Sequence, residues 1–203
     1  DGCRWIFCLS RARCIGTAMN DLTATKDEAR KAAFARRKEA FEIAGPGQAA
    51  ILSEVLAGYR GVPISGYMPI RTEISPLNAM TEAAAYGPVG VPVIRAAGQP
   101  LWFSRWEPEC EMVDGPFGAS VPALGAEIVP EILIVPLVSF DRHGGRLGYG
   151  GGFYDRTIEG LRARGPVLAI GYAFSAQESA DLPLEDTDQP LNMIITEKSV
   201  ISI

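Results

Sequence analysis

A glycine-rich segment with flanking arginines is the feature of this sequence best suited to chemistry. Residues 146–156 read Arg-Leu-Gly-Tyr-Gly-Gly-Gly-Phe-Tyr-Asp-Arg. Glycines let a backbone approach a polyphosphate closely, and a helix that begins beside them turns free amide groups toward the phosphate. Arg146 and Arg156 would add positive charge, and Asp155 could hold a Mg²⁺ ion that bridges phosphate oxygens. The segment therefore predicts an anion site, which a nucleotide could occupy.

The glycine spacing alone does not identify the ligand. No Gly-Lys-Ser/Thr follows, as a Walker A loop requires. Phe153 occupies the position of the last glycine of a dinucleotide-binding fingerprint. A tight connection that only turns the chain is the alternative to a phosphate-binding loop.

The elements on either side of this segment should position it. Residues 132–138 (ILIVPLV) are nearly all apolar, which is typical of a strand buried on both faces of a parallel sheet. Residues 153–164 predict a helix, and residues 167–174 predict another strand. In open α/β sheets, ligands bind beyond the carboxyl ends of the strands, where the glycine segment would lie.

Predicted strands and helices alternate along the whole chain. Thr25 and Glu28 form a capping-box pattern, so we expect a helix from about Lys26 to Ile43. The other predicted segments are a helix at 51–59, a strand at 62–68, a helix at 75–86, strands at 89–95 and 101–106, a loop at 114–126 and a strand at 192–196. This alternation predicts an α/β fold, a single domain with a mostly parallel sheet flanked by helices in a Rossmann-like three-layer architecture.

Composition narrows the function classes. The 203 residues carry a formal net charge of −5, which argues against a dedicated nucleic-acid binder. The chain has four cysteines and a single histidine, His143, without the short ligand spacings of a zinc site. The apolar run at residues 5–9 is too short for a membrane span. We expect a monomer in the reducing cytoplasm, with small-molecule partners and neither nucleic acid nor a membrane.

The first eighteen residues differ from the rest of the sequence. Residues 1–18 hold three of the four cysteines and show no apolar periodicity, and Met19 follows them. We expect residues 1–18 to be a non-native or disordered extension and residues 19–203 to be the catalytic domain. A targeting peptide is the alternative.

Residues 135–141, followed by residues 146–156, closely resemble the 5-formyltetrahydrofolate cyclo-ligases, also called methenyltetrahydrofolate synthetases. Three further segments agree with that family in the same order along the chain. They are the basic helix at residues 26–37, the run Tyr67-Met68-Pro69-Ile70 with Glu73, and Leu182-Pro183 with Asp188 and Pro190. The resemblance spans residues 25–196.

The resemblance implies an ATP- and Mg²⁺-dependent ligase that converts 5-formyltetrahydrofolate to 5,10-methenyltetrahydrofolate. ATP would phosphorylate the formyl oxygen, N10 of the folate would attack the activated carbon, and phosphate would leave. An amide-like oxygen is a poor leaving group, and phosphorylation makes it a good one.

The resemblance also implies roles for particular residues. Lys26 and Arg146 would be catalytic, and Asp155 and Asp188 would bind Mg²⁺. ATP would be bound by Lys26, Arg30, Arg146, Leu147, Gly148, Tyr149, Gly150, Gly151, Gly152, Phe153 and Tyr154. The folate would be bound by Met68, Glu73, Tyr149, Gly150, Gly151, Gly152 and Phe153. The carboxylate of Glu73 suits the amino and ring N–H donors of a pterin.

Some positions depart from the family pattern. Tyr149 stands where many members have arginine, and Asn192 stands where an acid is common. Ser120-Val121-Pro122 replaces the usual Glu-Pro pair. These differences leave two alternatives open: a related ATP-dependent enzyme that acts on a different formylated amine, and a non-catalytic nucleotide-binding module.

Overall fold

A seven-stranded sheet organises the chain, as seen in a computed structural model that describes residues 11–203 and the side chains from residue 23 onward except Phe117. The strand order is β11-β10-β9-β6-β1-β2-β3. The strands are β1 (Ile64–Ser65), β2 (Val89–Val93), β3 (Trp102–Trp106), β6 (Ile132–Pro136), β9 (Leu168–Tyr172), β10 (Met193–Ile195) and β11 (Val200–Ser202). Each neighbouring pair from β10 to β2 is parallel, and only the edge strands β3 and β11 pair antiparallel.

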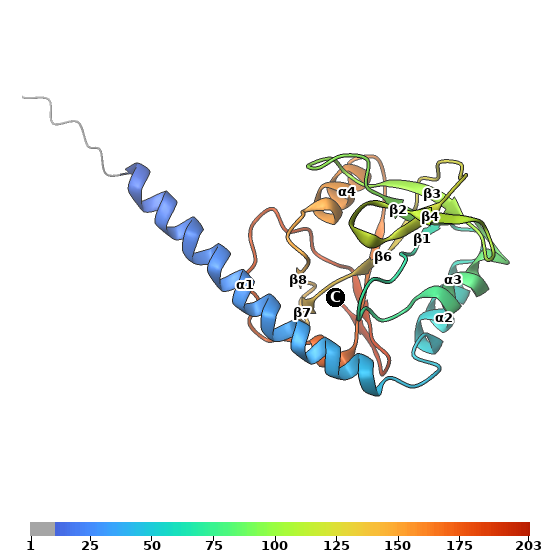
Figure 1. Ribbon diagram of the computed structural model, residues 1–203, viewed down its shortest axis with the longest axis horizontal. Helices are drawn as coiled ribbons and strands as arrows, with labels where there is room; N and C mark the ends of the chain where they lie inside the picture. The colour runs from blue at the N-terminus through green and yellow to red at the C-terminus, as the bar shows by residue number, and fades with distance from the viewer. Residues whose placement is uncertain (1–10) are drawn as a thin grey trace, which may run out of the picture.

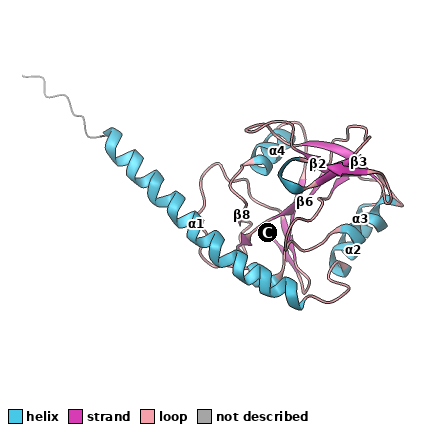
Figure 2. Ribbon diagram, in the orientation of Figure 1, coloured by secondary structure: helices cyan, strands magenta, loops and turns pink. Residues whose placement is uncertain are grey.

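Helices cover both faces of this sheet (Figures 1 and 2). The end of α1 (Arg11–Ile43) packs against one face, together with α2 (Ala50–Leu56), the short η1 (Ala57–Tyr59) and α3 (Leu77–Ala84). The opposite face is covered by α4 (Phe153–Arg162). The predicted three-layer α/β fold with a mostly parallel sheet is confirmed.

The central strand β6 shows why its sequence is apolar throughout. Ile132 and Ile134 belong to the core on the side of α2 and α3, and Leu133 and Val135 belong to the core on the side of α4. Successive side chains of a strand point to opposite faces, so a strand between two helical layers buries every residue. This arrangement places the end of β6, and the glycine segment after it, at one edge of the sheet.

Several short strands and helical turns were not predicted from the sequence. The predicted loop at 114–126 overlaps a hairpin of β4 (Met112–Asp114) and β5 (Ser120–Pro122), which enclose η2 (Pro116–Gly118). The segment between the strand predicted at 132–138 and α4 contains two strands that were not predicted, β7 (Ser139–Phe140) and β8 (Arg146–Leu147). The short η3 (Ser175–Gln177) and β11 were also missed. Strands of two or three residues are too short to show an alternating pattern.

The predicted start of the first helix was wrong. α1 begins at Arg11, so Thr25 lies inside the helix instead of capping it. The sequence before Thr25 contains no proline to stop the helix, and a capping residue in mid-helix costs little. Most of the predicted extension at residues 1–18 lies outside the described residues. None of the described helices is long and apolar enough to cross a membrane.

Candidate functional site

A cavity of about 1010 Å³ opens at the carboxyl ends of β1, β2 and β6. Tyr67 and Met68 follow β1, Ile94 follows β2, and Pro136 ends β6, and all four line the cavity. The connection from β1 to β2 passes through α3 on one face of the sheet, and that from β6 to β9 passes through α4 on the other. The two crossover connections therefore lie on opposite faces of the sheet. Open α/β sheets bind their ligands in the crevice at the point where the connections change face.

The structure brings the sequence-predicted site residues together around this one cavity. They come from three distant parts of the chain: α1, the segment after β1, and the stretch from β8 to the loop before β10. The predicted residues that line the cavity are Lys26, Arg30, Met68, Glu73, Arg146, Leu147, Gly148, Tyr149, Gly150, Gly151, Gly152, Phe153, Tyr154, Asp155 and Asp188.

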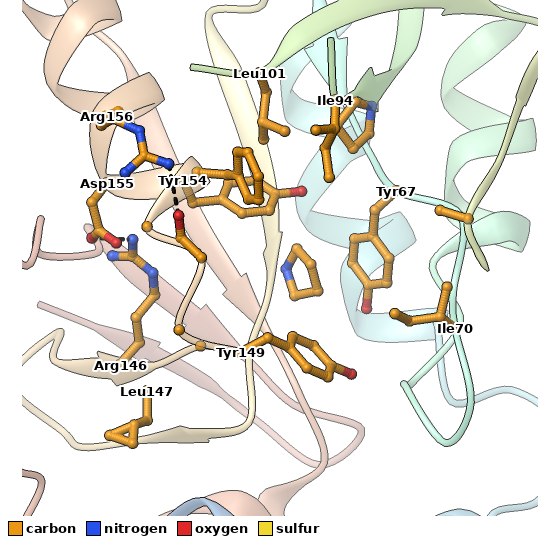
Figure 3. Close-up of a pocket in the computed structure, with 18 of the residues that line it drawn as sticks. Tyr67, Ile70, Ile94, Leu101, Arg146, Leu147, Tyr149, Tyr154, Asp155 and Arg156 are labelled. Carbon is orange, nitrogen blue, oxygen red and sulfur yellow. Dashed lines mark hydrogen bonds and ion pairs between the residues drawn. The ribbon is translucent and has the colours of Figure 1, made fainter. Parts of the chain in front are cut away.

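Two arginines donate hydrogen bonds to the glycine loop between β8 and α4, and Figure 3 shows one of them, Arg156. Arg30 donates a hydrogen bond from Nε to the carbonyl oxygen of Gly148 over 3.0 Å, and Arg156 donates from Nη2 to that of Gly151 over 2.6 Å. Gly150 and Gly152 have φ angles of 94° and 61°, which favour glycine. The loop therefore reaches the amino end of α4 in a conformation that side chains at these two positions would strain.

Ion pairs join the predicted phosphate-binding cations to the predicted metal-binding acids. Arg146 Nη2 lies 2.5 Å from Asp155 Oδ1. Figure 3 shows these two side chains beside each other. Lys26 Nζ lies 3.2 Å from Asp188 Oδ2 and 3.3 Å from Glu185 Oε2. Lys26 and Arg146 are nearly buried, which makes it costly to keep their charges. The neighbouring acids offset this cost.

The carboxylates of Asp155 and Asp188 suit a metal ion that is also bound by the phosphate oxygens of a ligand. Among the described residues, no group of three or more His, Cys, Asp or Glu side chains could hold a metal. The hydrogen bonds of Asp155 go to Oδ1 and those of Asp188 go to Oδ2, so each carboxylate can offer its second oxygen. Mg²⁺ typically takes one or two carboxylates and completes its shell with water and phosphate oxygens.

The opposite end of the cavity holds a buried carboxylate. Glu73 Oε1 accepts a hydrogen bond from the Tyr149 hydroxyl over 2.9 Å, and Oε2 accepts one from the backbone N–H of Ile70 over 2.9 Å. Only 4% of its side chain is exposed. Burial raises the pKa of Glu73, whereas these two hydrogen bonds and Arg37 lower it.

Two tyrosines give the cavity wall neutral hydroxyl groups. Burial and the charge of Glu73 raise the pKa of Tyr149 to about 12, so its hydroxyl keeps the proton that it donates. Burial also raises the pKa of Tyr154. The Tyr154 hydroxyl is buried without a hydrogen-bond partner among the described residues, so a ligand could satisfy it. Figure 3 shows the Tyr149 ring turned away from Arg146, on the side of Tyr67 and Ile70.

Sequence reasoning missed Arg37, which contacts this end of the cavity. Its Nη1 donates a hydrogen bond to the Tyr149 hydroxyl over 2.8 Å and lies 3.9 Å from Glu73 Oε1. The signal was available, because Arg30 and Arg37 are seven residues apart and seven residues make about two turns of a helix. Tyr67 was also missed as a wall residue, and its hydroxyl donates to the carbonyl oxygen of Ile74 over 2.6 Å.

Comparison with known proteins indicates a single family. The profile of the 5-formyltetrahydrofolate cyclo-ligase family matches residues 24–197. A 5-formyltetrahydrofolate cyclo-ligase of Mycolicibacterium smegmatis is 31% identical over 188 residues, which cover 86% of this chain and 94% of that protein. The Escherichia coli K12 cyclo-ligase is 37% identical over 105 residues, 49% of this chain. The latter match spans 57% of the relative's own length.

Solved structures agree with this comparison. The 5,10-methenyltetrahydrofolate synthetase of Aquifex aeolicus superposes with a TM-score of 0.67 at 26% identity, covering 87% of this chain and 92% of that one. The synthetase of Mycoplasma pneumoniae shares the fold, with a TM-score of 0.61 at 18% identity over 85% of this chain and 98% of that one. The chain belongs to the 5-formyltetrahydrofolate cyclo-ligase family.

Proposed function

We propose that the chain converts 5-formyltetrahydrofolate to 5,10-methenyltetrahydrofolate with ATP and Mg²⁺, releasing ADP and phosphate. The observation that carries this proposal is a cavity with two chemically different ends, a cation-rich glycine loop and a buried carboxylate. Single drug-sized ligands occupy pockets of roughly 300–1,000 Å³. The cavity of about 1010 Å³ lies at the upper end of this range.

The glycine end would bind the triphosphate. Lys26, Arg30 and Arg146 supply positive charge there, and the backbone from Gly148 to Gly152 can approach the phosphates closely. Lys26 and Arg146 already sit beside acids, so a phosphate would draw these cations partly away from Asp188 and Asp155. A Mg²⁺ ion held by Asp155, Asp188 and phosphate oxygens would neutralise charge on the transferring group.

The carboxylate end would bind the pterin. Both Glu73 oxygens can accept further hydrogen bonds, and a pterin offers an amino group and a ring N–H. Met68, Ile70 and Tyr67 supply an apolar wall for the ring. A pterin held there would direct its formyl group along the cavity toward the glycine loop.

The reaction would follow from this placement. The γ-phosphoryl group would move from ATP to the formyl oxygen and ADP would leave, with Arg146 and Lys26 stabilising the charge on the transferred group. N10 then attacks the formyl carbon and loses its proton, the bond from carbon to the phosphorylated oxygen breaks, and phosphate leaves. The chain's main contribution is to align the two substrates and to exclude competing water.

Measurement of ADP release tests whether nucleotide turnover depends on the folate. We expect ADP only when 5-formyltetrahydrofolate and Mg²⁺ are both present. ATP hydrolysis that is indifferent to the folate, but is stimulated by a different formylated amine, would favour the related enzyme. ATP binding without turnover under any of these conditions would favour the non-catalytic module.

Replacement of Glu73 by glutamine should weaken binding of the folate selectively. The variant keeps the volume of the side chain and removes the negative charge that would receive the pterin donors. We expect the KM for 5-formyltetrahydrofolate to rise by roughly tenfold or more, as for loss of a hydrogen bond to a buried charge. The KM for ATP should change little, and steady-state kinetics with each substrate varied in turn measure both constants.

A matched control for this variant is Glu82→Gln, which removes the same charge from α3 at a residue outside the cavity. It should leave both constants near those of the unaltered protein. Equal increases in the two KM values for Glu73→Gln would contradict the assignment of Glu73 to the folate.

The compartment and oligomeric state proposed from composition stay predictions. Cys110 is a free cysteine among the described residues, which is compatible with the reducing cytoplasm. Light scattering of the purified chain would test the predicted monomer, and a mass near 43.6 kDa (twice 21.8 kDa) would contradict it.

A further inference from the structure

Arg37 is a fully buried charge that the proposed chemistry does not use. Only 1% of its side chain is exposed, and it is not among the residues that line the cavity. Taking a guanidinium out of water is costly, so such a residue needs compensating contacts. Arg37 has contacts with two residues that do line the cavity, Glu73 and Tyr149.

The hydrogen bonds around Arg37 fix the direction of one proton. Arg37 donates from Nε to Thr72 Oγ1 over 3.1 Å and from Nη1 to the Tyr149 hydroxyl over 2.8 Å. A guanidinium has no acceptor, so the Tyr149 hydroxyl must accept from Arg37 and cannot donate to it. Its single proton is thereby directed to Glu73 Oε1, 2.9 Å away.

Ring contacts hold the guanidinium in this place. Its central carbon lies 5.1 Å from the centre of the Phe34 ring and 5.6 Å from that of Tyr149. The two rings themselves lie 5.6 Å apart and are tilted by 47°. Aromatic faces attract a guanidinium, so Arg37 and Tyr149 are fixed relative to each other by a ring contact as well as a hydrogen bond.

We propose that Arg37 is a positioning residue for the folate end of the cavity, acting through Tyr149 and Glu73 without touching the substrate. The inference rests on the proposed function, because it assigns Glu73 to the pterin. Arg37 orients the Tyr149 hydroxyl, the hydroxyl holds one oxygen of Glu73, and the Ile70 N–H holds the other. The remaining acceptor capacity of the carboxylate then faces the ligand with its charge intact.

The charges around Glu73 make this role measurable as a pH dependence. Burial raises the pKa of Glu73, and Arg37 and Arg71 oppose that rise. The tyrosines facing it, Tyr67, Tyr149 and Tyr154, have pKa values raised further above neutrality, so they stay uncharged. Loss of Arg37 should therefore move the protonation of Glu73 to higher pH.

The test is Arg37→Gln, with the kinetic constants measured across pH. Because Glu73 must be ionised to receive the pterin donors, kcat/KM for 5-formyltetrahydrofolate should fall as pH drops through the pKa of Glu73. In Arg37→Gln that fall should begin at higher pH, with the folate KM raised about tenfold or more. The KM for ATP should change less than about threefold, because Arg37 contacts no residue assigned to ATP alone.

Two further variants separate positioning from simple folding. Lys38→Gln removes one positive charge from the neighbouring, exposed residue and should leave the pH profile unchanged. Arg37→Lys keeps the positive charge but lacks the planar guanidinium with its several N–H donors. It should therefore show the pH profile of the unaltered protein but only part of its folate affinity. An Arg37→Gln protein whose ATP and folate constants change equally, with an unshifted pH profile, would overturn the proposal.

A readout without substrate distinguishes this inference from the proposed reaction. The chemical shift of a ¹³C-labelled Glu73 carboxyl, assigned by its loss in Glu73→Gln, follows its ionisation directly. We expect the titration of Glu73 to move to higher pH in Arg37→Gln and to stay near that of the unaltered protein in Arg37→Lys. An unshifted titration would overturn the role of Arg37, whereas absent turnover in the unaltered protein would overturn only the proposed reaction.

Discussion

Asp155→Asn should lower kcat by about a hundredfold or more while leaving the fold intact, as expected when a group that stabilises transition-state charge is removed. Asparagine has nearly the same shape and can still accept the hydrogen bonds from Arg146 and the backbone N–H of Gln189. It lacks the negative charge that would hold Mg²⁺ beside the phosphates. The variant should also need more Mg²⁺ for half-maximal rate, which a titration of the cation at saturating ATP measures.

The control for Asp155→Asn is Asp186→Asn, a loss of the same charge from an exposed residue outside the cavity. We expect this control to behave like the unaltered protein. A near-normal kcat and an unchanged Mg²⁺ requirement in Asp155→Asn would show that the metal assignment is wrong.

Arg146→Met should produce a second large loss of kcat, again about a hundredfold or more. Arg146 is nearly buried in the cavity wall and presents its guanidinium beside Asp155. That position suits two-point contact with a phosphate, which methionine cannot make and which lysine makes only as a point charge. Arg146→Lys should therefore recover only part of the rate in the same steady-state assay.

Arg142→Gln is the matched control for Arg146→Met, because Arg142 lies in the same hairpin but is exposed and paired with Glu178. Such surface pairs contribute little to stability, so this variant should keep normal kinetics and nearly normal folding. If Arg146→Met lost activity only in proportion to its loss of folded protein, measured by thermal unfolding, Arg146 would have a structural role alone.

The sequence predicted the centre of the fold well because its signals there are strong and local. Residues 132–138 are apolar at consecutive positions, and β6 is indeed buried between two helical layers. The glycines after it were expected at the carboxyl edge of a parallel sheet, and the loop lies there. The capping pattern at Thr25 gave the wrong start for the first helix, which begins at Arg11. A local signal for a helix start does not end a helix that has already begun.

Residues that line the cavity could be predicted where they are neighbours in the sequence, and not where the fold joins distant residues. The contact of Arg37 with Tyr149 spans 112 positions, and neither residue type reveals it. Tyr149 was noted as a departure from arginine in the glycine string. In the structure its hydroxyl faces Glu73, and the guanidinium beside that carboxylate comes from α1 instead.

The Lys26 contact with Asp188 shows the same limit. A lysine on a helix face and an aspartate in an acidic loop are each usually plain surface groups. They lie 3.2 Å apart across 162 positions because α1 passes the loop before β10. Only tertiary structure brings this cation and this acid to the same cavity.

Formation of the methenyl product is the most direct test of the proposed reaction. The purified chain is mixed with 5-formyltetrahydrofolate, ATP and Mg²⁺, and the near-ultraviolet absorbance of the conjugated methenyl product is followed. We predict a rise that requires all three components and that matches the ADP released one for one. No rise with a folded chain that still binds ATP would contradict the proposed substrate.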